Sequence, residues 1–242
     1  MLAEAFTVPF RGAHAKHSWA VLTGSVLATA ILFQGTVALA PNPVSLLAAV
    51  LLVGPVLVWA GYCRRVVGQH PDGTDGLPEP GSVRELAGAG VATGVLTAAY
   101  LVVPTVILLV TVAGVQSVAP ASVRGGGGLV FLTGSTVSVV VALAVSYLYP
   151  GALGRLASGS SFSNALDPRQ RGTVYRDPTY LVTWASATTV GVLGAAVFGV
   201  ALTNRGPLGL LAALVSVYAS LVASRLVGLG WHRVSDSSSR RP

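Results

Sequence analysis

The sequence has little cysteine and histidine, and this shortage excludes several kinds of site. Among 242 residues there are one cysteine and four histidines. Because the chain has a single thiol, Cys63, an internal disulfide cannot form. His14, His17, His70 and His232 follow no zinc-ligand spacing. The sequence therefore predicts neither a metal site nor a cofactor.

Sequence signatures of catalysis are absent as well. The chain contains no GxSxG, HExxH or CxxC motif. Four consecutive glycines at 125–128 lack the GxxxxGK[ST] pattern of a phosphate-binding loop. No acid or histidine lies inside an apolar run to activate a serine nucleophile. We therefore predict that the protein is not an enzyme.

Charge is scarce, and acidic charge most of all. Only 10% of the residues are charged, and eight acidic residues against fifteen basic ones give a net charge of +7. A basic soluble protein would suggest nucleic acid as partner, but here the basic residues flank apolar runs and no aromatic residues interleave with them. The pattern is typical of a membrane protein whose basic side chains meet anionic headgroups. We expect a lipid bilayer and no nucleic acid as partner.

Long apolar runs are what the chain does have, since 52% of its residues are hydrophobic. Six runs are long enough to cross a bilayer as helices. They are residues 18–40, 44–62, 86–114, 129–149, 180–202 and 208–230. The sequence thus predicts an all-α integral membrane bundle of six transmembrane helices. Residues 1–17 form an N-terminal segment and 231–242 a disordered tail, both cytoplasmic. A signal peptide ending near Ala40 is the competing interpretation of the first run.

The basic residues also predict the orientation of the bundle. They gather in the N-terminal segment, in the loops after the second and fourth runs and in the tail, whereas the three turns on the other side hold only Arg124 and Arg205. Such an excess marks the cytoplasmic side. The four tryptophans lie near the same side, as expected of rings that prefer the headgroup level. Both termini are therefore predicted to lie on the cytoplasmic side of the cell membrane.

Cysteine labelling in intact cells tests this topology. In a Cys63→Ser background, we expect Gly126→Cys to react with a membrane-impermeant maleimide and Asp72→Cys to stay unlabelled. Lysed cells provide the control, because both thiols should then react. Labelling of Asp72→Cys alone in intact cells would show that the topology is the reverse of the predicted one.

Several arginines are candidate contacts to lipid headgroups. They are Arg155, Arg169, Arg171 and Arg176 in the loop from Tyr147 to Tyr180, and Arg225 inside the last run. Arg225 lies about five residues from the inner end, so we expect its side chain to extend to the headgroups. In the loop, Phe162, Ala165 and Leu166 share the spacing of one helical face. A short interfacial helix and an irregular loop both fit that segment.

Small residues recur at intervals of four in the apolar runs. Ladders of this kind are Gly90 and Gly94; Gly134, Ser138, Ala142 and Ser146; Ala187, Gly191, Ala195 and Gly199; and Ser216, Ser220, Ser224 and Gly228. Close helix packing explains such ladders, and a serine-lined pathway is the functional alternative. Pro55 and Pro104 predict kinks. The sequence favours a membrane-embedded interaction or scaffold protein, with a partner protein or a second copy of the chain, over a small transporter.

Several strings of the chain resemble one family. They are VPFRG, VWAGYCRRVV, YLYPGALGRLASG, FSNALDPRQ, DPTYLVTWASA and VSVYASLVASRLVGLG, and they extend over about residues 8–233. They resemble multi-pass membrane proteins, mostly from halophilic archaea, that are catalogued as a domain of unknown function. More distantly, the chain looks like the membrane domain of some glycerophosphodiester phosphodiesterases, without a hydrolase domain. The resemblance implies a multi-span membrane domain and no assigned activity.

Overall fold

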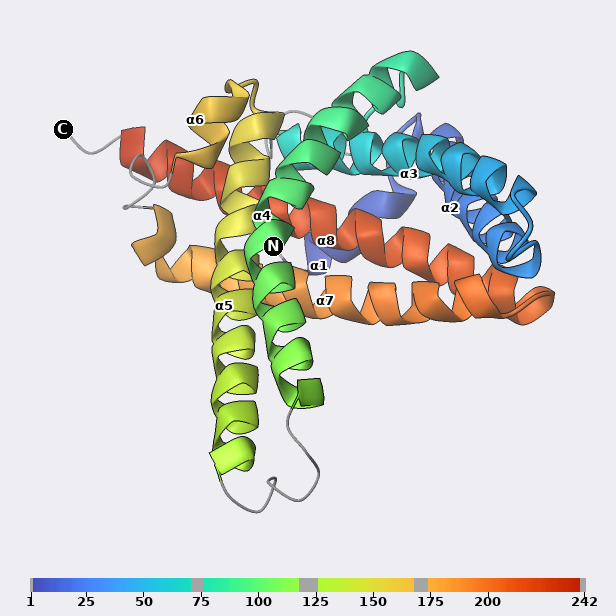
Figure 1. Cartoon of the computed structure of the whole chain (residues 1–242). Helices are drawn as coiled ribbons and strands as arrows, with labels where there is room; N and C mark the ends of the chain where they lie inside the picture. Colours follow the sequence, from blue (N-terminus) through green and yellow to red (C-terminus); the bar gives the residue numbers. More distant parts are fainter. Residues whose placement is uncertain (1, 71–75, 118–125, 168–173, 240–242) are drawn as a thin grey trace.

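A computed structural model describes residues 2–70, 76–117, 126–167 and 174–239, and all regular structure in these ranges is helical (Figure 1). The six long helices are α2 (Ala15–Ala38), α3 (Val44–Gly68), α4 (Val83–Ser117), α5 (Gly126–Ala157), α7 (Pro178–Thr203) and α8 (Pro207–Ser239). The short elements are α1 (Leu2–Thr7), η1 (Val8–Phe10), α6 (Phe162–Leu166) and η4 (Val174–Arg176). The predicted all-α class is confirmed.

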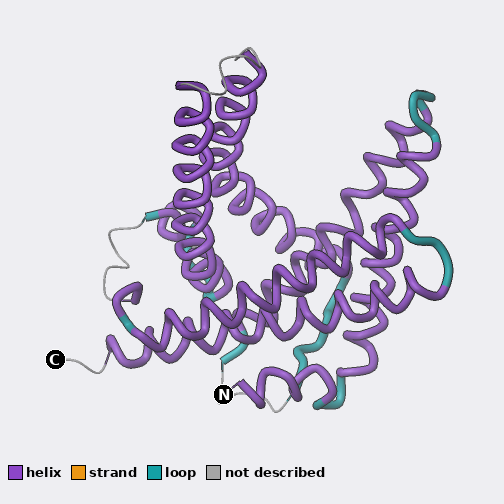
Figure 2. Tube along the Cα trace, turned by 90° about the horizontal axis from the view of Figure 1, so that it is seen from below, coloured by secondary structure: helices purple, strands orange, loops and turns teal. Residues whose placement is uncertain are grey.

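The long helices form three consecutive antiparallel hairpins, α2–α3, α4–α5 and α7–α8. They share a common end, at which α3, α5 and α8 finish and α4 and α7 begin (Figures 1 and 2). We call this the terminal end. The far part of the α4–α5 hairpin diverges from the other two hairpins in both views. Half of the apolar part of α8 is buried, against 6% in α4, so α8 is the central helix.

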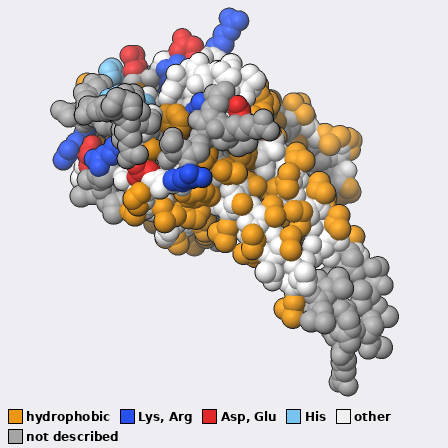
Figure 3. Space-filling model, turned by 90° about the vertical axis from the view of Figure 1, so that its left-hand side faces the viewer, with side chains coloured by type: hydrophobic (Ala, Val, Ile, Leu, Met, Phe, Trp, Pro, Cys, Tyr) orange, Lys and Arg blue, Asp and Glu red, His pale blue; other side chains and the backbone are white. Residues whose placement is uncertain are grey.

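The surface explains where this fold resides. All six long helices are long and apolar enough to cross a membrane. Large apolar side chains such as Val102, Leu109 and Val192 are exposed along them. Charged side chains gather at one end, while hydrophobic ones cover much of the remaining described face (Figure 3). Exposed apolar surface of this extent needs hydrocarbon rather than water around it. The chain is a multi-pass membrane protein.

Small residues bring the helix backbones together, as the ladders predicted in part. A Cβ on Gly61 would collide with the carbonyl of Leu86, and one on Gly90 with the carbonyl of Leu57, so α3 and α4 cross in backbone contact. A Cβ on Gly194 of α7 would lie 2.6 Å from the Cβ of Ala219. These close contacts replace the hydrophobic driving force that helices lack in lipid. Gly199, a member of the α7 ladder, has no neighbour within 4 Å of such a Cβ.

A proline inside α5 is accommodated by aromatic side chains from the following segment. Pro150 has no N–H to donate to the carbonyl of Ser146, four residues earlier. Trp184 Nε1 donates to that oxygen at 2.8 Å. Tyr180 Oη donates to the carbonyl of Tyr147 at 2.8 Å, and Tyr175 Oη to that of Leu148 at 3.1 Å. Because these bonds supply donors that the helix lacks at this point, they let α5 continue through the proline.

Two helices extend beyond the predicted spans for reasons of packing. α5 continues to Ala157, past the predicted end at residue 149, because Ala152, Leu153 and Leu156 are buried in the core. α8 reaches Ser239, so helix occupies 231–239, where the sequence predicted a disordered tail. Trp231 packs against Gly154 of α5 and donates from Nε1 to Ser158 Oγ at 3.1 Å. Residues 240–242 lie outside the described residues.

The two long loops are more ordered than their composition indicates. A short helix, α6, forms at Phe162–Leu166, and Ser161 caps it by accepting a hydrogen bond from the backbone N–H of Asn164. In the loop before α4, Leu77 is buried in the main core. Its neighbour Pro78 accepts hydrogen bonds through its carbonyl from Ser18 Oγ and Tyr62 Oη. Tertiary contacts thus hold the described part of a loop whose Pro and Gly content predicts only a surface connection.

Candidate functional site

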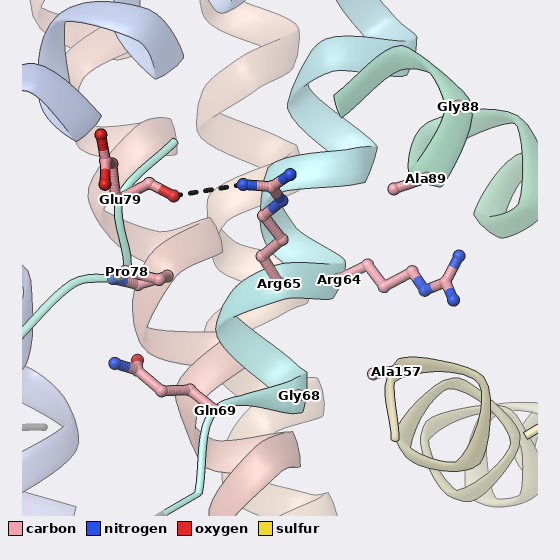
Figure 4. Close-up of a pocket in the computed structure, with 9 residues that line it drawn as sticks. All are labelled: Arg64, Arg65, Gly68, Gln69, Pro78, Glu79, Gly88, Ala89 and Ala157. Carbon is pink, nitrogen blue, oxygen red and sulfur yellow. Dashed lines mark hydrogen bonds between the residues drawn. The ribbon is translucent and has the colours of Figure 1, made fainter. Parts of the chain in front are cut away.

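A cavity of about 640 Å³ opens at the terminal end of the molecule, where the α2–α3 and α4–α5 hairpins meet. It is lined by Arg64, Arg65, Gly68 and Gln69 of α3, by Pro78 and Glu79 of the loop, by Gly88 and Ala89 of α4, and by Ala157 of α5 (Figure 4). Its volume lies within the range of small-molecule sites. Four of the nine lining residues are glycine or alanine, so the chemistry of the cavity comes from the two arginines, the glutamate and Gln69.

Arg65 is held in place by three acceptors. Its Nη1 donates to the carbonyls of Pro80 at 2.7 Å and Glu79 at 3.3 Å, and the latter bond is drawn in Figure 4. Its Nη2 forms an ion pair with Glu85 Oε2 at 2.6 Å. The Arg65 charge is therefore balanced by Glu85, and its side chain fastens the loop to the start of α4.

Arg64 points in a different direction and has fewer partners. Its Nη2 donates to the carbonyl of Leu156 at 2.7 Å, near the end of α5, and the backbone N–H of Gly159 donates to the same oxygen at 3.3 Å. Figure 4 shows its guanidinium extending into the space between α4 and α5. The half-buried side chain forms no ion pair with any carboxylate among the described residues. Arg64 is thus a partly desolvated cation without a counter-charge in the described part of the chain.

Behind the cavity, on the other side of Gln69, lies Arg225. Its side chain is 2% exposed, although the sequence predicted that it would extend to the headgroups. Nη1 donates to the carbonyl of Gln69 at 3.2 Å, while Nε is buried without a hydrogen-bond partner in the described part of the chain. Nη2 lies 3.8 Å from Glu4 Oε1 of α1. The counter-charge that sequence reasoning missed comes from the N-terminal segment, outside the apolar runs.

We expect Glu4 to keep α1 on α8. Ala5 is fully buried against α8, and Tyr218 Oη donates to the carbonyl of Phe6 at 3.0 Å. Glu4→Lys would place two cations together and weaken this docking by about 1–2 kcal/mol, because the half-exposed position of Glu4 is screened by water. Hydrogen exchange of residues 2–10 should rise in the order wild type, Glu4→Gln, Glu4→Lys. Hydrogen exchange that stays equal to that of the wild type in both variants would mean that the charge of Glu4 does not hold α1.

Two of the histidines lie side by side although they are far apart in the sequence. His70 and His232, 162 positions apart by their numbers, stack edge to face with ring centroids 5.0 Å apart. His232 is buried and His70 exposed. Within the described ranges, no group of three or more His, Cys, Asp or Glu side chains is placed to hold a metal ion. The pair lies close to the last turn of α3 and extends the polar cluster at the terminal end.

Of the five arginines predicted to contact lipid, the three that the structure describes lie in different surroundings. Arg155 Nη1 donates to the carbonyl of Asn164 in α6 at 3.1 Å, and Arg176 is exposed at the end of η4. Arg225 is buried between α1, α3 and α8. Arg169 and Arg171 lie outside the described residues. Headgroup contact by these side chains stays a prediction, and Arg225 would be reached only by a group that enters the protein.

Comparison with known families bears on the elements just described. A family model described as a protein of unknown function, DUF4013, matches residues 44–204, more than half of the chain. The chain belongs to this family. In this DUF4013 protein, the matched range runs from the first residue of α3 to just after α7. It includes Arg64, Arg65 and the aromatic side chains around Pro150, whereas α2 and α8 lie outside it.

The family match is narrower than the resemblance over residues 8–233 that the sequence strings indicated. No curated protein and no solved structure matches the chain. The family description carries no activity. The function therefore has to be argued from the geometry of the bundle and of its terminal end.

Proposed function

We propose that this DUF4013 protein is a non-enzymatic, membrane-embedded interaction or scaffold protein of the cell membrane, with both termini in the cytoplasm. The observation that carries the proposal is the backbone contact between α3 and α4 at Gly61 and Gly90. It lies one turn beyond Arg64 and Arg65 toward the middle of the helices and leaves no room for a solute between them. The cavity is therefore a recess on the surface of a packed bundle.

The interior between α2, α3 and α8 supports the same proposal. Apolar side chains fill it, among them Leu22, Val26, Val58, Val217 and Leu221. Two serines of the α8 ladder donate within their own helix, Ser216 Oγ to the carbonyl of Ala212 and Ser220 Oγ to that of Val217. Hydroxyls that are satisfied within their helix do not need a polar pathway. Close packing is thus the better interpretation of the ladder.

A small transporter is the alternative, and the prolines inside α3 and α4 favour it. Pro55 and Pro104 lie within these helices and remove backbone hydrogen bonds there. Figure 1 shows α4 changing direction along its length. Helices interrupted in this way can move between two arrangements. We also propose that the chain is related to membrane proteins of halophilic archaea and distantly to the membrane domains of glycerophosphodiester phosphodiesterases. Contact of its arginines with anionic headgroups is a further part of the proposal.

Two measurements on the full chain separate the candidates. After purification in mild detergent, we expect a protein partner or a second copy of the chain to remain in a fixed ratio through a size-exclusion step. Proteoliposomes of the purified protein should release trapped small solutes no faster than empty liposomes. A monomer without a partner that accelerates solute release would contradict the scaffold proposal and support transport.

A further inference from the structure

We propose that the cavity at the terminal end binds a phosphate-bearing anion through Arg64. The inference goes beyond the scaffold proposal, because it assigns a ligand class to the cavity whether or not a partner protein exists. It starts from the charges of the lining. Arg65 is paired with Glu85 at 2.6 Å, whereas Arg64 has no carboxylate partner among the described residues.

The remaining acidic side chain of the lining does not neutralise Arg64. Glu79 is exposed, and it forms no ion pair with a described residue. Figure 4 shows its carboxylate on the opposite side of the cavity from the Arg64 guanidinium. A half-buried guanidinium has lost part of its hydration, so an anion that reaches it gains more than it would at an exposed side chain.

The hydrogen-bonding capacity of Arg64 indicates the kind of anion. A guanidinium carries five N–H donors, and the described contacts use one of them, from Nη2 to the carbonyl of Leu156. That bond also fixes the orientation of the planar fork. A fixed fork with free donors matches the oxygens of a phosphate group, which can accept two parallel hydrogen bonds.

The walls leave space for such a group. Gly88, Ala89 and Ala157 face the cavity with small side chains, and a Cβ on Gly88 would have no neighbour within 4 Å. The volume of about 640 Å³ exceeds that of a phosphate group and also accommodates a glycerol or sugar attached to it. The predicted position at the cytoplasmic headgroup level offers two sources, a phospholipid headgroup and a soluble phosphate compound.

Binding of radiolabelled inorganic phosphate to the full-length protein in a neutral detergent tests the site. We expect saturable binding that becomes about tenfold weaker in Arg64→Gln, because charge-assisted hydrogen bonds are lost. Arg64→Lys should lie in between, since it keeps the charge without the fork. Arg84→Gln, an exposed arginine on α4 outside the lining, is the charge-matched control and should stay within about twofold of the wild type.

A steric variant keeps the test independent of the bond from Arg64 to α5. Gly88→Leu should fill the cavity and weaken phosphate binding about tenfold, whereas Gly54→Leu on the exposed side of α3 should not. Absence of saturable binding in the wild type, or equal losses in Arg64→Gln and Arg84→Gln, would overturn the proposal. So would unchanged binding in Gly88→Leu.

A second arm distinguishes the sources. Protein reconstituted in vesicles of phosphatidylglycerol and phosphatidylcholine is extracted again, and the retained phosphatidylglycerol is counted by mass spectrometry. Lower retention in Arg64→Gln than in Arg84→Gln assigns the site to a lipid headgroup. Equal retention, together with weakened phosphate binding, assigns it to a soluble phosphate compound. Neither result depends on finding the protein partner or second copy that the scaffold proposal requires.

Discussion

Replacing Gly90 with alanine is expected to destabilise the protein by about 1–3 kcal/mol, the range for overpacking of a close contact. The new methyl group would collide with the carbonyl of Leu57, because α3 and α4 touch through their backbones at this point. Neither helix can move aside without loosening the packing of α3 on α4. Thermal unfolding in mild detergent, followed by far-ultraviolet circular dichroism, should show a lower midpoint.

Gly88→Ala is the matched control for this prediction. It lies two residues earlier on α4, and an added Cβ there has no neighbour within 4 Å. Since alanine favours helix over glycine by up to about 1 kcal/mol, the control should be neutral or slightly stabilising. The double variant Gly61→Ala, Gly90→Ala should cost less than the sum of the single variants, because one separation of the helices relieves both collisions. Equal midpoints for Gly88→Ala and Gly90→Ala would contradict the crossing.

Replacing Trp184 with phenylalanine is expected to cost about 1–3 kcal/mol, because it leaves the Ser146 carbonyl without a donor inside the membrane. The acceptor is available only because Pro150 has no N–H. In a Pro150→Ala background, the helix should supply its own N–H to Ser146. We therefore expect the cost of Trp184→Phe to fall by about 1 kcal/mol or more in that background, as measured by a double-mutant cycle on the same unfolding transition.

Trp59 provides the control for this cycle. Its Nε1 also donates a hydrogen bond, at 3.2 Å to Ser220 Oγ, but this acceptor is a side-chain hydroxyl and not a carbonyl that a proline leaves without its N–H donor. Trp59→Phe should therefore cost the same with Pro150 and with Pro150→Ala. If the cost of Trp184→Phe were also the same with Pro150 and with Pro150→Ala, the hydrogen bond from Trp184 to Ser146 would not be the reason that α5 tolerates its proline.

The helix contacts of small residues were predicted in part from the sequence. The ladders correctly placed small residues at helix contacts, and Gly90 and Gly228 lie against the backbone of α3. They missed Gly61 and Gly194, which make equally close contacts, and they included Gly199, which makes none. Spacing along one helix identifies a face, but which residue of the face is crossed depends on the partner helix and on the crossing point.

The candidate site was predictable only in its charge. Two consecutive arginines, Arg64 and Arg65, follow an apolar run, and such a pair predicts the cytoplasmic end of a span. Their different roles could not be foreseen, because Glu85 pairs with Arg65 while Arg64 reaches the end of α5. Glu4 was not recognised as a partner of Arg225, since 221 positions separate them. Contacts between residues so distant in the chain arise from folding and leave no local pattern.

The sequence by itself determined that this is an all-helical, multi-pass membrane protein, because apolar length and the scarcity of charge depend on composition alone. Composition did not determine the ends of the helices. α5 passes Pro150 and α8 passes residue 230 because partners from other helices satisfy the backbone and bury Trp231. Only the tertiary structure decided where helices stop, which of Arg64 and Arg65 has no carboxylate partner among the described residues, and where the cavity lies. Each of these depends on side chains that meet across different hairpins.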